Sequence, residues 1–101
     1  MRNDRVNLTK EQIADFCKKN HIKKFAFFGS VLRDDFRSDS DVDVLVTFDR
    51  SVPITFLDIA GMEMELSKII GKKIDLSTPG GLSQYFRDQV IAEAEVQYEQ
   101  E

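Results

Sequence analysis

The stretch that most limits the possible folds of this chain is residues 29–46, GSVLRDDFRSDSDVDVLV. Five aspartates lie between positions 34 and 43, and the last two alternate with valines where an apolar segment begins. Carboxylates repel one another, and burying them beside apolar side chains is costly. The fold must therefore hold a strand with one charged face and one face packed in a core.

The rest of the chain alternates helical and strand patterns. Short segments rich in β-branched and aromatic residues predict three strands, over 24–28, 42–48 and 73–77. Apolar spacing and capping residues predict helices over 10–20, from Ser30 for a few residues, over 54–70 and over 82–94. Residues 96–98 fit either a helix or an edge strand. This order predicts an α/β or α+β fold, a small mixed sheet with helices packed against it.

Length and composition narrow the class of protein. The 101 residues are expected to form a single domain, with residues 1–8 flexible. A net charge of −4 gives no basic surface, so direct nucleic-acid binding is not expected. No apolar run approaches the ~20 residues of a membrane span. The one cysteine, Cys17, is interpreted as a buried small hydrophobe, and the chain as cytoplasmic.

Three aspartates have the spacing of a metal site. Residues two apart on a strand point to the same face, so Asp41 and Asp43 project together while the valines face the core. Asp75, between two apolar residues of the segment 73–77, repeats the pattern. If these strands are neighbours, the three carboxylates converge at one edge of the sheet. Such hard oxygen ligands suit Mg²⁺ or Mn²⁺, and two ions about 3.5–4 Å apart serve in-line displacement at phosphorus.

Gly29 and Ser30 have the properties of a phosphate-binding pair. They follow a predicted strand and open a short predicted helix, where free backbone N–H groups favour an anion. Gly29 lets the backbone approach the ligand, and the Ser30 hydroxyl can donate to a phosphate oxygen. Arg37 flanks this position and is a candidate contact for a triphosphate, with a solvated loop charge as the alternative. A lone Gly-Ser pair or a lone Asp-x-Asp is common, so neither motif is specific by itself.

Taken in order, these motifs resemble the nucleotidyltransferase superfamily related to DNA polymerase β. The shared pattern is Gly29-Ser30, ten residues, Asp-x-Asp leading into an apolar strand, and then the isolated Asp75. The short chain, the run DSDVDVLV and the ending DLSTPGGLSQYFRDQVIAEAEVQYE are most similar to the minimal nucleotidyltransferases, or MNT proteins. The family often has glycine where this chain has Asp34 or Asp35, which leaves the shape of that loop open.

The resemblance implies a role for each matched residue. Asp41 and Asp43 would bind the divalent ions, two Mg²⁺ with Mn²⁺ as an alternative, that carry ATP. Asp75 would complete the metal site and help to deprotonate the acceptor hydroxyl. Gly29 and Ser30 match the family's phosphate-binding pair.

The resemblance also implies a partner, a HEPN-domain ribonuclease toxin encoded nearby, held in a hetero-oligomer. The MNT protein would act as antitoxin by transferring AMP from ATP to a toxin tyrosine. The core is expected to leave no residues for an acceptor-binding domain, an expectation that favours a protein acceptor over a small molecule. Two alternatives remain, an antitoxin that only occludes its partner and an enzyme that modifies a small-molecule hydroxyl.

Overall fold

The computed structural model describes residues 8–32 and 41–100. In chain order the elements are α1 (Lys10–Lys19), β1 (Ile22–Phe28), the 3₁₀ turn η1 (Gly29–Leu32), β2 (Val42–Phe48), α2 (Phe56–Ile70), β3 (Ile74–Ser77), the 3₁₀ turn η2 (Pro79–Gly81), α3 (Arg87–Glu93) and β4 (Glu95–Glu99).

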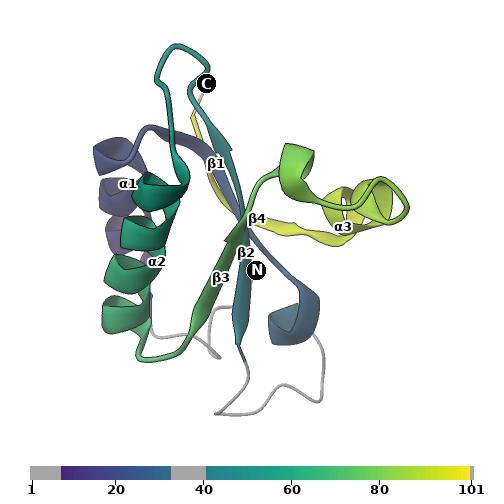
Figure 1. The fold of residues 1–101 in the computed structure, drawn as a ribbon. Helices are drawn as coiled ribbons and strands as arrows, with labels where there is room; N and C mark the ends of the chain where they lie inside the picture. The colour runs from purple at the N-terminus through teal and green to yellow at the C-terminus, as the bar shows by residue number, and fades with distance from the viewer. Residues whose placement is uncertain (1–7, 33–40, 101) are drawn as a thin grey trace.

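The strands form one mixed sheet in the order β3-β2-β1-β4. β1 pairs antiparallel with both β2 and β4, whereas β2 and β3 are parallel. A parallel pair needs a crossover connection, and α2 supplies it. Helices α1 and α2 lie against one face of the sheet, and α3 lies on the other side (Figure 1). One face of the central strands β1 and β2 therefore lies toward α1 and α2, and the other face lies on the side of α3.

The main core lies between the sheet and the two longer helices. β1 contributes Phe25 and Phe27, which are fully buried and pack edge-to-face with ring centroids 5.6 Å apart. β2 contributes Val42, Val44 and Val46 to the same core. Asp43, between two of these valines, consequently faces the side of the sheet where α3 lies.

Helix α2 begins two residues later than its apolar spacing predicts, at Phe56. The cause is a reciprocal capping box: the Asp58 N–H donates to Thr55 Oγ1 at 3.3 Å, and the Thr55 N–H donates to Asp58 Oδ2 at 2.9 Å. Strand β1 begins at Ile22, two residues earlier than predicted, because Ile22 pairs with Phe48 on β2.

The prediction of a last helix over 82–94 is wrong for its first five residues. Ser83 makes a turn instead: its hydroxyl accepts the Tyr85 N–H at 3.3 Å, and its carbonyl accepts the Phe86 N–H at 3.2 Å. Such local hydrogen bonds from serine compete with a helix. The Arg87 guanidinium then donates to the Leu82 carbonyl at 3.0 Å and closes the segment, so α3 spans only seven residues.

Three aromatic residues, Phe56, Phe86 and Tyr98, lie in different environments. Phe56 and Phe86 lie outside the core, with exposed fractions of 91% and 48%. Tyr98 packs against the core from β4, the strand that pairs with β1. Residues 96–98, which fit either a helix or an edge strand by sequence, therefore form a strand. Phe36 lies outside the described residues.

Cys17 is fully buried, as predicted for a small apolar side chain. Burial raises the pKa of its thiol to about 12, so the thiol stays protonated at neutral pH and Cys17 does not supply a nucleophile. Among the helices of the described residues, none has the length and apolar character needed to cross a membrane.

Gly61, in the middle of α2, is expected to be replaceable. A Cβ built there meets nothing within 4 Å, which excludes close packing as its reason. Gly61→Ala should raise the free energy of unfolding by about 0.5–1 kcal/mol, because alanine has the better helix propensity. Urea denaturation measures the change. Gly71→Ala should instead lower the free energy of unfolding, because Gly71 ends the same helix at φ 81°, a conformation unfavourable for alanine. A less stable Gly61→Ala variant would contradict this expectation.

Candidate active site

The pairing of β2 with β3 brings two of the predicted aspartates together. Asp43 and Asp75 are register partners in this parallel pair, so they lie side by side on adjacent strands. Asp41 lies immediately before β2, two residues from Asp43. Asp43 is half-buried, whereas Asp41 and Asp75 are exposed. The condition on which the sequence prediction depended, that these two strands are neighbours, is therefore met.

Gly29 joins the phosphate-binding motif to the acidic motif. It ends β1 with φ 74°, and β1 places Phe28, the residue before it, in register with Asp43. A Cβ at Gly29 would collide with Oδ2 of Asp43 and lie 3.2 Å from its Cγ. The Asp43 carboxylate therefore packs directly on the Gly29 backbone. Glycine is required here both for its left-handed φ and for the space that the carboxylate occupies.

The helix predicted to begin at Ser30 is a single 3₁₀ turn, η1. This turn begins at Gly29, one residue earlier than predicted. Four residues of 3₁₀ structure carry little of the dipole of an α-helix, so the expected contribution of a helix dipole is small. Binding of phosphate at this turn would depend on individual backbone N–H groups. The Ser30 side chain and Arg37 lie outside the described part of the structure.

A depression of about 340 Å³ opens beside Gly29 and Asp43. Its remaining lining comes from Phe28 on β1 and from α3. The α3 side contributes Phe86, Gln89, Val90 and Glu93. These four residues have helical i, i+3, i+4, i+7 spacing, a signal present in the sequence. Sequence reasoning had assigned no site residue to this segment.

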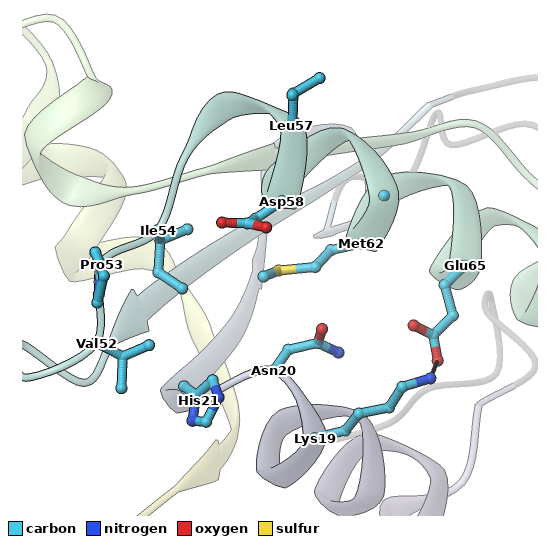
Figure 2. Close-up of a pocket in the computed structure, with 11 residues that line it drawn as sticks. Lys19, Asn20, His21, Val52, Pro53, Ile54, Leu57, Asp58, Met62 and Glu65 are labelled. Carbon is cyan, nitrogen blue, oxygen red and sulfur yellow. Dashed lines mark hydrogen bonds and ion pairs between the residues drawn. The ribbon is translucent and has the colours of Figure 1, made fainter.

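A larger cavity, of about 520 Å³, lies at the other end of the sheet (Figure 2). It is lined by the end of α1, the start of α2 and the segment that connects β2 to α2. Figure 2 shows the ion pair between Lys19 and Glu65 across it, at 3.0 Å. β2 runs from Asp43 toward this end, so the cavity is remote from the candidate site residues Asp43 and Asp75. We therefore place the candidate active site at the smaller depression, which Gly29 and Asp43 line.

Asp43 and Asp75, which together form an acidic edge of the sheet, have the oxygen donors that suit a divalent metal. Within residues 8–32 and 41–100, no three acidic, histidine or cysteine side chains form a ready-made metal cage. Mg²⁺ does not require one, because it is usually held by one or two carboxylates together with substrate phosphates and water. Asp43 and Asp75, in register on one edge, are a donor set of this kind.

The mixed sheet, the paired Asp43 and Asp75 and the adjoining Gly29 fit an enzyme that acts on a nucleotide. Consistently, the family described as nucleotidyltransferase domain matches residues 10–97. The chain belongs to this family.

Among curated proteins, the chain is similar to two proteins from Methanocaldococcus jannaschii. Both are named as protein adenylyltransferases, an activity that is inferred for them. One is 29% identical over 89 residues, covering 88% of this chain and 94% of the relative. The other is 33% identical over 76 residues, covering 75% of this chain and 76% of the relative. Nucleotidyl transfer is thus the activity of the class.

Among solved structures, one described as a minimal nucleotidyltransferase matches with a TM-score of 0.71 and 34% identity, covering 84% of this chain and 85% of its own. A toxin–antitoxin complex with AMP-PNP matches with a TM-score of 0.75 at 17% identity, and the match covers 93% of this chain and 76% of the solved chain. A third, from Shewanella oneidensis, holds a tri-AMPylated HEPN toxin with an MNT antitoxin and matches with a TM-score of 0.64 at 16% identity, covering 89% and 69%. The last two show likeness of fold. The predicted polymerase β-like fold and the resemblance to minimal nucleotidyltransferases are confirmed.

Proposed function

We propose that this protein is an antitoxin that transfers AMP from ATP to a tyrosine hydroxyl of a HEPN ribonuclease toxin. The observation that carries the proposal is the packing of the Asp43 carboxylate on Gly29, with Asp75 in register beside it. This contact makes the candidate phosphate-binding turn and the acidic edge parts of one site. A nucleotidyl-transfer site needs both, because the triphosphate must be held while charge develops at phosphorus.

In the proposed reaction, the acceptor oxygen forms a bond to the α-phosphorus of ATP. The bond between the α-phosphorus and the bridging oxygen breaks, and pyrophosphate leaves. Asp75 takes the proton from the acceptor hydroxyl, a role supported by the exposure of its carboxylate to solvent. Asp41 and Asp43 would hold Mg²⁺, with Asp75 sharing in the site. When bound, the ions would offset the charge of the triphosphate and polarise the phosphoryl oxygens.

The groups around η1 would bind the rest of the triphosphate. The glycine at position 29 leaves the backbone open to the ligand, and we assign the Ser30 hydroxyl and Arg37 to phosphate contacts. The ATP assignment draws support from the toxin–antitoxin structure of similar fold that is described with AMP-PNP.

The exposed aromatic side chains around the depression are consistent with a protein acceptor. Phe86 lines the depression and is 48% exposed, and the neighbouring Tyr85 is 91% exposed. Exposed aromatic side chains are enriched where proteins bind one another. The names of the archaeal relatives and the HEPN toxin in the Shewanella complex support the same choice. We place the reaction in the cytoplasm, in a hetero-oligomer with the toxin and without nucleic acid as substrate.

Mass spectrometry of the partner tests the proposal. The chain, with labelled ATP, Mg²⁺ and the protein encoded next to it, should add one or more AMP groups to a partner tyrosine. The partner's ribonuclease activity should fall in parallel. An Asp41→Ala, Asp43→Ala double variant should add none, because both metal-binding carboxylates are gone.

The other outcomes identify the alternatives. Inhibition of the ribonuclease by the double variant, with no change in partner mass in the wild type, would show an antitoxin that acts by binding alone. AMP found only on an added small-molecule hydroxyl compound would show that the acceptor is not a protein. Either result would overturn the proposal.

A further inference from the structure

The strand that carries Asp75 has little support from the sheet. β3 is four residues long and lies at the edge of the sheet, where β2 is its one strand partner among residues 8–32 and 41–100. Parallel pairing is slightly less stable per residue than antiparallel pairing. An edge strand also leaves backbone groups on its outer side without a strand partner. The position of Asp75 opposite Asp43 therefore needs a further source of rigidity.

The backbone of β3 shows where that support is required. The Lys73 carbonyl accepts the Val42 N–H at 2.9 Å, so the backbone groups of position 73 point toward β2. Backbone groups alternate sides along a strand, so those of Leu76 point away from β2, to the outer edge. The peptide that follows Asp75 therefore has its N–H on the unpaired side.

Glu63 of α2 satisfies this N–H. Its Oε2 accepts the hydrogen bond from the Leu76 N–H at 2.7 Å in a part-buried position. A hydrogen bond to a carboxylate is shorter and stronger than one between neutral groups. Glu63 lines a cavity between α2 and β3, and it does not line the depression that contains Asp43.

We infer that Glu63 is a positioning residue for the transfer reaction, an inference that rests on the proposed function. It fixes the peptide between Asp75 and Leu76, and thereby the place of the Asp75 carboxylate beside Asp43. Without this acceptor, the outer edge of β3 opens, and Asp75 no longer keeps one position relative to the acceptor hydroxyl.

The test compares Glu63→Ala with Glu63→Gln. Glu63→Ala should lower kcat for AMP transfer about tenfold or more, as is typical when a supporting partner of a reactive group is removed. The KM for ATP should change by less than about twofold, because the groups on β1 and β2 remain in place. Glu63→Gln should keep more than about half of kcat, since the amide oxygen accepts the same hydrogen bond. Hydrogen exchange at the Leu76 amide should be faster in the alanine variant alone.

Ser67→Ala is the matched control. The Ser67 hydroxyl donates to the Lys72 carbonyl at 2.7 Å, so it also ties α2 to the segment entering β3, but farther from Asp75. This variant should lose stability while kcat stays within about twofold of the wild type. Circular dichroism at the assay temperature establishes that each variant is folded.

Three results would overturn the inference. The first is a kcat in Glu63→Ala equal to that of the wild type. The second is a loss of kcat in Glu63→Gln as large as that in Glu63→Ala. The third is a loss of kcat in Ser67→Ala as large as that in Glu63→Ala. Absence of transfer by the wild type would instead overturn the proposed function, and the inference with it. If the wild type transfers AMP and any of the three results is found, the inference about Glu63 is overturned and the proposed function stands.

Discussion

Asp43→Asn is expected to lower the rate of AMP transfer about 10³-fold. Asparagine keeps the size and shape of the side chain that packs on Gly29, so the change removes charge and leaves the contact in place. A carboxylate that holds a catalytic metal contributes several kcal/mol to stabilising the transition state, and each 1.36 kcal/mol is about tenfold in rate. Rates are measured from the AMP added to the partner with saturating ATP and Mg²⁺.

Binding of Mn²⁺ to the Asp43→Asn variant is the second measurement. Its affinity, measured by calorimetry with a non-hydrolysable ATP analogue, should fall together with the rate. The matched control is Asp15→Asn, an exposed aspartate on α1, the helix that covers the other face of the sheet. That variant should transfer AMP at the wild-type rate. Asp43→Asn activity within about tenfold of the wild type would mean that Asp43 is not a metal ligand.

Gly29→Ala is expected to abolish measurable transfer, with a loss of more than about 100-fold. The new methyl group would occupy the space of the Asp43 carboxylate, which must then move. A displacement of about 1 Å in a reacting group can cost 10²-fold in rate. The variant should also be less stable by more than about 1–2 kcal/mol, because alanine is unfavourable at a left-handed φ.

Gly71→Ala separates the two causes of this loss. Gly71 has φ 81°, close to the 74° of Gly29, but a Cβ at position 71 meets nothing within 4 Å. Gly71→Ala should therefore lose about 1–2 kcal/mol of stability while transferring AMP at nearly the wild-type rate. Urea denaturation and the transfer assay are run on both variants. Equal activities of the two would show that contact between Gly29 and Asp43 has no part in the reaction.

Local patterns predicted most of the elements well. β2 spans the predicted residues 42–48, because alternating valines bury one face wherever the strand lies in the sheet. The capping box at Thr9 placed the start of α1 for a similar reason: its hydrogen bonds join residues three apart in the chain. The same signal at Thr55 and Asp58 was missed, and α2 was predicted to begin two residues early.

The C-terminal third was the least predictable. Residues 95–99 form a strand because β1 has a free edge that accepts them, a condition that local sequence does not contain. The helical spacing of residues 86–93 was present, but which residues it faces depends on where α3 folds back against the sheet. The lining of the candidate site by Gln89 and Glu93 was missed for this reason.

The sequence by itself determined which residues are candidates for the chemistry. Asp41, Asp43, Asp75, Gly29 and Ser30 could be chosen because their side chains, spacing and order suit phosphate and metal, whatever surrounds them. Only the tertiary structure decided that Asp75 lies beside Asp43, that Asp43 packs on Gly29, and that Glu63 holds the outer edge of β3. Each of these contacts joins residues 13 or more positions apart, so each depends on strand order and helix packing. Those are set by burial of the whole core, which no short segment specifies.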